Sequence, residues 1–442
     1  MAHHVHPILV FLAIIATAAP GHAIFHFDFR TDMISPFDGG YSRHDDWRRA
    51  ALASNARIAK DSSKLRKLLG IGSEDASEAD VGDAVAGKEG HWLTVGIGTP
   101  PQPAKMMLDT GSPLIFTQCE LFNAPKAKQI EPIVNPAKSS TFKVLPCNDP
   151  LCKGAEFNNC TENKCMYTTQ YTSLTSEGVF ASDTFTFAKE RNVAVPLGFG
   201  CGTLSGEGLA GASGIMGLSW SNLSLITQLS VPRFSYCFTP FTELKPSPLL
   251  FGTKADLTKY KTTGPIQTVS LIKNPVDDAH YYVPMVGISL GAKRLDVPSA
   301  SLALNPDGTG GTTVVTASTM SFLVKPAFEE LKKEVMEAVK FSVTKRKVKE
   351  YQLCFELPAG TSMEKVEVPP LRLHFDGGAE MSLPRDNYFQ EPKPGLMCLA
   401  VGEAPESFFP NVISNVQQQN MHMVFDIQNR KLSFAPTECE KM

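Results

Sequence analysis

The sequence predicts an all-β protein made of two related lobes, and two features carry this prediction. From residue 88 onward, short runs of alternating apolar and polar residues, such as VFASDTFTFA, are broken by Gly, Pro, Asn and Asp, as in strands joined by turns. The stretch AKMMLDTGSPLIF, at residues 104–116, is echoed by GGTTVVTASTMSFLVKPAF at residues 310–328. Because these predicted strands and turns extend over more residues than one β domain normally contains, we expect two lobes, at residues 88–240 and 241–442.

The N-terminus predicts export from the cell. Residues 7–19 form an apolar run of signal-peptide length, and the small residues that follow suit a signal peptidase, so residues 1–23 are interpreted as a signal peptide. A membrane anchor is the weaker alternative because the run is short for a bilayer. We therefore expect a protein of the secretory pathway, in the extracellular space or the cell wall, with the vacuole as an alternative.

Residues 24–87 differ in texture from the rest of the chain. The stretch DDWRRAALASNARIAKDSSKLRKLL has helical spacing of its apolar residues, and GSEDASEADVGDAVAGKEG is acidic and poor in large apolar residues, as flexible linkers are. Together they predict a pro-segment with an acidic linker, and a loose N-terminal extension is the alternative. Within the β region the strongest predicted helix is KPAFEELKKEVMEAVKF, whose apolar face holds Phe328, Leu331, Val335 and Val339.

Charge and cysteine content narrow the function. The net charge is −3, so no basic excess attracts nucleic acid or an anionic membrane, and neither is an expected partner. Ten cysteines in an exported chain predict five disulfides. Zinc binding is the weaker alternative for four of them: Cys147, Cys152, Cys160 and Cys165. Two sequons, at Asn159 and Asn222, predict a glycoprotein if they are exposed. No metal or organic cofactor is expected.

The motif LDTGS is the clearest carrier of chemistry. It places Asp109 between an apolar strand and a second one, PLIF. A glycine in such a loop lets backbone amides approach and hydrogen-bond the carboxylate, which is how a reactive acid is held at a strand end. We expect Thr110, Gly111 and Ser112 to line the cleft beside Asp109.

Beyond this motif, the chain after residue 90 carries a long series of ordered motifs: GIGTPPQP, LDTGS, TQC, NPAKSSTFKVLPCNDPLC, FGCG, SGIMGL, FSYCF, LLFG, YYVPMVGISLGAKRL, PDGTGGT, LRLHFDGGAEMSLPRDNYF, GLMCLAV and NVQQQNMHMVFDIQNRKLSFAPTEC. In this order they resemble the pepsin-like aspartic protease family, in its plant nepenthesin-like branch, and HFDFRTDMISPF resembles that branch's pro-segment. The resemblance implies a bilobal fold with a long cleft between the lobes. It also implies a monomer that holds a polypeptide substrate or protein ligand in the cleft or on its loops.

The chemistry implied by this resemblance needs two aspartates, one from each lobe. They share a water and a proton, because like charges so close together cannot both ionise. Asp109 is the first. Counting from the Gly-Gly pair at 310–311 places Val315 at the second position, and a shifted register would place Thr316 there.

Neither register of the second motif offers a carboxylate. The nearest acid is Asp307, which is interpreted as a hairpin-turn residue. The hydroxyl residues that flank the motif in the family are retained, so Thr316, Ala317 and Ser318 are expected to line the cleft opposite Asp109. The second lobe is therefore predicted to have lost its catalytic acid.

Other positions also depart from the family pattern. The flap tyrosine is matched by Tyr171, and the aromatic residue that supports it is normally a Trp, whereas here it is Phe116, which cannot donate a hydrogen bond. By resemblance, the ten cysteines are expected to pair as Cys119–Cys201, Cys147–Cys165, Cys152–Cys160, Cys237–Cys439 and Cys354–Cys398.

Two functions follow from this pattern. The first is a secreted homologue of aspartic endopeptidases that is catalytically defective and acts by binding, as an inhibitor does. A less specific version of this hypothesis is a duplicated protein under relaxed selection that has no defined partner. The second is an active aspartic endopeptidase that works at acidic pH through Asp109 and an unrecognised second acid. The missing carboxylate favours the first.

Overall fold

The structure, a computed structural model, describes residues 30–34, 91–120, 133–153, 158–171, 174–187, 193–206, 209, 211–241, 245–348, 351–406 and 409–442. The expected signal peptide and most of the expected pro-segment and linker lie outside these residues. No helix in these ranges is long and apolar enough to cross a membrane.

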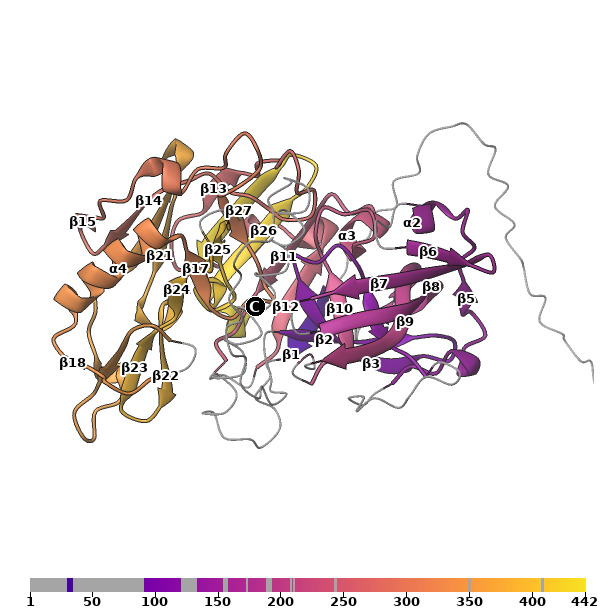
Figure 1. The fold of residues 1–442 in the computed structure, drawn as a ribbon, viewed down its shortest axis with the longest axis horizontal. Helices are drawn as coiled ribbons and strands as arrows, with labels where there is room; N and C mark the ends of the chain where they lie inside the picture. Colours follow the sequence, from indigo (N-terminus) through magenta and orange to yellow (C-terminus); the bar gives the residue numbers. More distant parts are fainter. Residues whose placement is uncertain are drawn as a thin grey trace, which may run out of the picture.

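The chain folds into two β lobes that lie side by side in Figure 1. The all-β, two-lobed architecture predicted from the sequence is confirmed. The elements of the first lobe are β2 (Trp92–Ile97), β3 (Gln102–Asp109), β4 (Phe116–Gln118), β5 (Lys143–Val144), α2 (Pro150–Lys153), β6 (Asn158–Thr161), β7 (Lys164–Gln170), β8 (Leu174–Phe187), β9 (Val193–Gly206), β10 (Gly214–Gly217) and α3 (Leu225–Gln228).

The second lobe is built from shorter strands in three small sheets. Its elements are β14 (Met285–Leu290), β15 (Lys293–Arg294), β16 (Thr312–Val314), β17 (Ser321–Leu323), α4 (Lys325–Ala338), β18 (Ser342–Val343), β19 (Cys354–Glu356), β20 (Leu371–Phe375), β21 (Glu380–Leu383), β22 (Phe389–Lys393), β23 (Leu396–Leu399), β24 (Val401–Glu403) and β25 (Asn411–Ile413).

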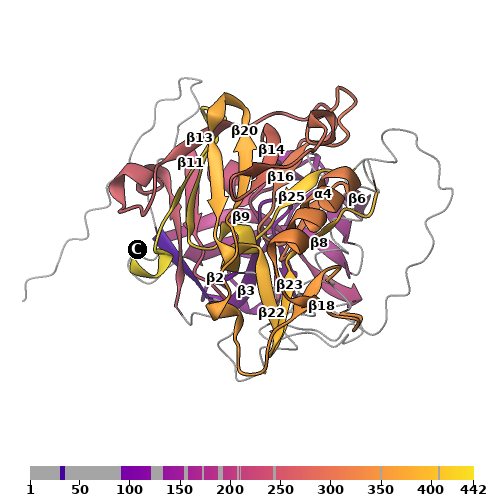
Figure 2. The ribbon, with the colours of Figure 1, turned by 90° about the vertical axis from the view of Figure 1, so that its left-hand side faces the viewer.

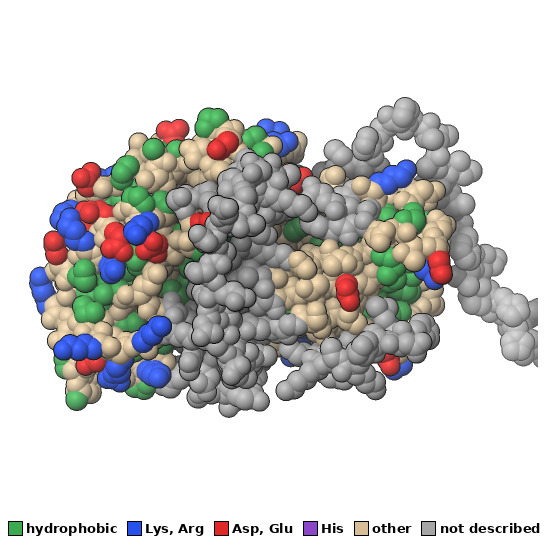
Figure 3. All heavy atoms as spheres, in the orientation of Figure 1, with side chains coloured by type: hydrophobic (Ala, Val, Ile, Leu, Met, Phe, Trp, Pro, Cys, Tyr) green, Lys and Arg blue, Asp and Glu red, His purple; other side chains and the backbone are tan. Residues whose placement is uncertain are grey.

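The predicted helix is α4, which lies in front in Figure 2, seen from the side of the second lobe. It buries Phe328, Leu331 and Val335 in the core, as its spacing requires. Its outer face carries acidic and basic side chains that are interspersed over this lobe in Figure 3. One of its ion pairs joins Lys333 Nζ to Glu330 Oε1 at 3.1 Å.

A shared sheet ties the two lobes together. From one edge, its strands run in the order β13-β27-β26-β11-β12-β1-β2-β3, where β13 is Gln267–Ser270, β27 is Lys431–Pro436, β26 is Met421–Asp426, β11 is Arg233–Cys237 and β12 is Ser247–Phe251. Strand β1 (Arg30–Ile34) pairs with β12 on one side and with β2 on the other. These five residues belong to the segment 24–87, which is predicted to be a pro-segment and linker, and they form a strand of the shared sheet.

Each lobe contains the same four-strand unit. In the first, β3 runs parallel to β10, β10 antiparallel to β4, and β4 parallel to β9. In the second, β16 runs parallel to β25, β25 antiparallel to β17, and β17 parallel to β24. The weak sequence echo between residues 104–116 and 310–328 therefore corresponds to two equivalent units, and the loops after β3 and β16 are equivalent loops.

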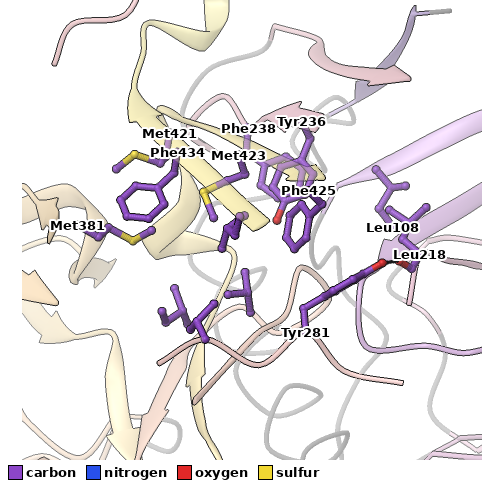
Figure 4. Packing of buried hydrophobic residues seen from close by; sticks show 14 of the residues in the cluster. Leu108, Leu218, Tyr236, Phe238, Tyr281, Met381, Met421, Met423, Phe425 and Phe434 are labelled. Atoms are coloured by element: carbon purple, nitrogen blue, oxygen red, sulfur yellow. Dashed lines mark hydrogen bonds between the residues drawn. The ribbon is translucent and has the colours of Figure 1, made fainter. Parts of the chain in front are cut away.

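Buried aromatic and sulfur-containing side chains fill the space where the lobes meet (Figure 4). The Tyr281 hydroxyl, from the second lobe, donates a hydrogen bond to the Leu218 carbonyl of the first at 2.6 Å. The Tyr281 ring also packs on Phe425, with ring centroids 4.8 Å apart. This core sets the relative position of the two equivalent loops.

The ten cysteines form five disulfides, which excludes the zinc alternative. Three pairs are as expected: Cys119–Cys201, Cys237–Cys439 and Cys354–Cys398. The other two expected pairs are wrong, because the structure joins Cys147 to Cys160 and Cys152 to Cys165.

The burial of these four cysteines explains the exchange. Cys160 and Cys165 face each other across the β6–β7 hairpin, so both are within reach of the α2 segment. Cys152 and Cys165 are both buried in the same apolar cluster, whereas Cys160 is exposed. Buried sulfur therefore pairs with buried sulfur, which sequence spacing alone does not reveal.

Candidate functional site

The two equivalent loops are locked together by a reciprocal set of hydrogen bonds. The Thr110 hydroxyl accepts from the Thr316 N–H at 3.1 Å and donates to the Val314 carbonyl at 2.9 Å. The Thr316 hydroxyl accepts from the Thr110 N–H at 3.1 Å and donates to the Leu108 carbonyl at 2.9 Å. Each threonine makes the same pair of bonds to the other loop, so the two residues occupy equivalent positions.

This reciprocity decides which residue corresponds to Asp109. Because Thr110 matches Thr316, the residue that precedes each must match as well, and Val315 takes the place of Asp109. The strand pairing gives the same answer: Met107 and Thr313 occupy equivalent places in their four-strand units. The shifted register, with Thr316 in the acid's position, does not fit these contacts.

The Asp109 carboxylate lies at the end of β3 and is only 4% exposed. Its Oδ1 accepts a hydrogen bond from the Gly111 N–H at 2.9 Å, and its Oδ2 accepts from the Ser112 hydroxyl at 2.5 Å. Such donors stabilise the ionised form of a carboxyl group. The first loop thus holds its carboxylate with one backbone amide, as the glycine predicts, and with one side-chain hydroxyl.

Val315 has an apolar side chain where Asp109 has an acid. It is partly buried and packs against a cluster of the second lobe that includes Met320 and Phe322. Its backbone is held firmly: the N–H donates to the Ile413 carbonyl at 3.0 Å, and its carbonyl accepts from the Gln418 side-chain amide at 3.2 Å. The backbone of this loop is held in place, while the side chain at the position of the acid is apolar.

The residues after Val315 line the junction between the lobes. Ala317 is buried and packs in the cluster that contains Phe116 of the first lobe. The Ser318 hydroxyl, equivalent to that of Ser112, donates to the Met320 carbonyl at 2.8 Å. The second loop therefore keeps a hydroxyl at the position equivalent to Ser112, and this hydroxyl is bonded to a backbone carbonyl.

The expected flap residue, Tyr171, lies directly over the Asp109 loop. Its hydroxyl is 3.0 Å from the Ser112 hydroxyl, and its ring packs on Phe116 with centroids 5.9 Å apart. At the end of the β7–β8 hairpin, Tyr171 and Leu174 form hydrogen bonds to each other through their backbones. The Ser112 hydroxyl is thus a polar neighbour of the Tyr171 hydroxyl, whereas Phe116, which has no hydrogen-bond donor on its side chain, contributes ring packing.

Sequence analysis missed a second polar pair beside Asp109, made by His280 and Asp277. The His280 Nδ1 lies 2.7 Å from Asp277 Oδ2, and the Tyr282 hydroxyl donates to the same oxygen at 3.0 Å. Burial acts to raise the pKa of Asp277, but the charge and hydrogen bond of His280, with bonds from Ala279 and Tyr282, outweigh it and lower that pKa. The available signal was the acidic pair and histidine in VDDAHYY, just ahead of a strand.

His280 reaches the Asp109 loop through the space left by a glycine. A Cβ placed on Gly111 would lie 3.0 Å from His280 Nε2 and 3.3 Å from Asp109 Oδ1. The imidazole and the carboxylate therefore flank the same point, and any larger residue at Gly111 would crowd both. The geometry gives Asp109 a titratable neighbour from the second lobe, although not at the position of the missing acid.

Three remaining predictions concern Asp307, the two sequons and metal binding. Asp307 lies in a turn, where its carboxylate accepts from the N–H and hydroxyl of Thr309 and not beside Asp109. Asn159 and Asn222 are both exposed. Among the described residues, no group of three or more His, Cys, Asp or Glu is arranged to hold a metal ion.

Comparison with known proteins gives the same class as the geometry. Residues 92–253 match the family model described as "Xylanase inhibitor N-terminal", and residues 280–436 match "Xylanase inhibitor C-terminal". Aspartic proteinase nepenthesin-1 of Nepenthes gracilis is 35% identical over 362 residues, which cover 80% of this chain and 79% of that protein. Nepenthesin-2 of the same plant is 32% identical, over 85% of this chain and 84% of its own length.

Solved structures support the fold. Soybean basic 7S globulin has a TM-score of 0.59 at 17% identity, over 79% of this chain and 93% of its own. The crystal structure of edgp has a TM-score of 0.63 at 18% identity, over 82% and 94%. The fold, the paired loops and the relatives define a member of the pepsin-like aspartic protease family. The chain belongs to the nepenthesin-like branch of that family.

Proposed function

We propose that this protein is a secreted, polypeptide-binding member of the family that does not hydrolyse peptide bonds by the two-carboxylate mechanism. The observation that carries the proposal is Val315, an apolar side chain in the place equivalent to Asp109. In that mechanism one carboxylate takes a proton from water while the other protonates the peptide carbonyl. Each role contributes roughly 10²–10⁴ in rate, and Val315 can supply neither.

The rest of the cleft supports binding. The loops, the disulfides and the interlobe core are those of a well-ordered protein, so the loss of the acid has not been accompanied by loss of the fold. Both family models are described by the name of an inhibitor, a protein that acts by binding another. An inhibitor-like role, in which loops or cleft hold a protein ligand, is the form of the proposal we favour.

An active acid endopeptidase is the second candidate, and one observation favours it. Asp109 keeps its hydrogen-bond donors, and the His280 imidazole lies beside it. A histidine there could act as the second acid–base group in place of residue 315. The second candidate therefore makes a distinct prediction, since its activity would depend on both Asp109 and His280.

The test is cleavage of an unfolded protein substrate by the purified protein, from mildly to strongly acidic pH, with and without a pepstatin-type inhibitor. We expect no cleavage above background under conditions where an active relative digests the substrate fully. Asp109→Asn should then change nothing. Cleavage that Asp109→Asn abolishes would overturn the proposal, and its loss in His280→Asn as well would establish the second candidate.

A further inference from the structure

A hollow of about 250 Å³ lies between the lobes beside the Asp109 loop. Trp220 and Asn222 come from the first lobe, and Leu271, Lys273, His280 and Arg430 come from the second. The two sides are bonded across the junction, since the Trp220 N–H donates to the Ala279 carbonyl at 3.1 Å. His280 belongs to both the hollow and the Asp109 site, so a ligand in the cleft can extend into the hollow.

The hollow combines an apolar wall with basic groups. The partly exposed Trp220 ring and the Leu271 side chain form the apolar part. Lys273 and Arg430 are exposed, and among the described residues neither lies within ion-pair distance of a carboxylate. The Leu271 N–H donates to the Arg430 carbonyl at 2.8 Å, and Lys273 lies two residues further along, so both cations line the same hollow.

The acids of the hollow do not cancel these cations. The Asp277 carboxylate is hydrogen-bonded to His280, to the Tyr282 hydroxyl and to the Ala279 N–H, so its charge is compensated within the protein. Asp278 is the remaining carboxylate in the lining. Two basic side chains therefore face one available acid, and an imidazole adds positive charge when it is protonated.

We propose that this hollow receives a carboxylate of the bound polypeptide, either an acidic side chain or a free C-terminus. The carboxylate pairs with Lys273 and Arg430, and the carbon atoms that carry it pack on Trp220 and Leu271. A guanidinium and an ammonium group together are well suited to a single carboxylate. The proposal rests on the proposed polypeptide-binding function and names the ligand chemistry that this part of the site selects.

The test uses immobilised full-length protein and three mixtures of N-acetylated octapeptides whose randomised positions exclude Asp and Glu. The first has one fixed Glu and an amidated C-terminus, the second has Gln in its place, and the third has Gln and a free C-terminal carboxylate. We expect the first or the third to be retained about tenfold more than the second, which corresponds to about 1.4 kcal/mol. Which of the two is retained identifies the source of the carboxylate.

Variants then locate the site. Lys273→Met and Arg430→Met should each remove most of the preference, whereas Lys431→Met, which changes an exposed lysine next to Arg430 but outside the hollow, should not. Unchanged thermal unfolding shows that each variant is folded. Equal retention of all three mixtures, or a preference that survives both variants, would overturn the inference and leave polypeptide binding intact. Retention of no mixture would overturn both proposals.

Discussion

At the scale of single residues, the two equivalent loops differ most at position 315, where Val315 corresponds to the carboxylate of Asp109. Thr110 and Thr316 exchange equivalent hydrogen bonds, so the loop that should carry the second acid is built, with Val315 in place of the acid and Ala317 in place of the glycine. Ser318 occupies the sequence position equivalent to Ser112, although its hydroxyl donates to the Met320 carbonyl while that of Ser112 donates to Asp109. The second loop therefore keeps the interlobe threonine contacts of the first loop but has no carboxylate at position 315.

Restoring the acid should require a second change. A Cβ on Gly111 would lie 3.3 Å from the Asp109 carboxylate, so by equivalence the methyl group of Ala317 would crowd an acid at position 315. We expect the double variant Val315→Asp, Ala317→Gly to cleave unfolded protein at acidic pH, at least about 10²-fold above the wild type, since one acid–base role is restored. Cleavage rate and sensitivity to a pepstatin-type inhibitor measure this.

The matched control is Val315→Asn with Ala317→Gly, which has the same shape but no acid. It should stay inactive. A folded double variant with Asp that is no more active than this control would mean that the flap or cleft also blocks catalysis, and the loss of the acid would not be the sole cause of inactivity.

The informative element is strand β1. Arg30–Ile34 lies between β12 and β2, with Thr31 opposite Leu249 and Met33 opposite both Ser247 and Leu93. Met33 is fully buried. A segment that resembles a removable pro-segment thus supplies a strand to the sheet that joins the lobes, and its removal would expose the backbone edges of two neighbours.

Cutting the chain after β1 should therefore not release it. With a site for a specific protease inserted between residues 70 and 87, we expect the N-terminal fragment to co-elute with the body on native gel filtration and to separate in denaturant. Met33→Ala, which removes buried volume worth about 2–5 kcal/mol, should weaken this association. Thr94→Ala, at an exposed position of β2, is the control and should not. Dissociation of the wild-type fragment on cleavage would contradict a structural role for β1.

At the scale of the whole molecule, two buried histidines contribute to the pH dependence of stability. His91 is stacked between Phe238 and Phe241 at the lobe junction, and burial lowers its pKa to about 3. His422 lies in β26, and burial lowers its pKa to about 4. Both stay neutral in the folded state at mildly acidic pH, whereas the unfolded chain would protonate them near pH 6.5.

The free energy of unfolding should consequently fall as the pH drops below about 6.5. Because the unfolded state then binds more protons, each histidine costs about 1.4 kcal/mol per pH unit, so the two together cost about 5 kcal/mol at pH 4.5. Urea unfolding at pH 7 and pH 4.5 measures the difference. His91→Gln and His422→Gln should each flatten the dependence, and His374→Gln, at a partly exposed imidazole, should change it much less. An unfolding free energy that is constant or rises on acidification would contradict this account.

Local patterns in the sequence were sufficient for much of the fold and part of the site. Period-two runs predicted the strands, because one face of each is buried, and the spacing of Phe328, Leu331 and Val335 predicted α4. The place of Asp109 between two apolar strands predicted the first loop, and ordered motifs predicted the family. These features depend on residues that are close together in the chain.

Contacts between distant residues were decided only by the tertiary structure. The exchange between Thr110 and Thr316 spans the two lobes, and it selects Val315 over Thr316 as the counterpart of Asp109. Cys152 pairs with Cys165 because the complete fold buries both side chains in the same apolar cluster. His280 reaches Asp109 only because Gly111 leaves space for it, and β1 enters a sheet whose other strands lie far along the chain. Sequence patterns report which side of an element is buried, but which surfaces meet depends on the packing of the complete molecule.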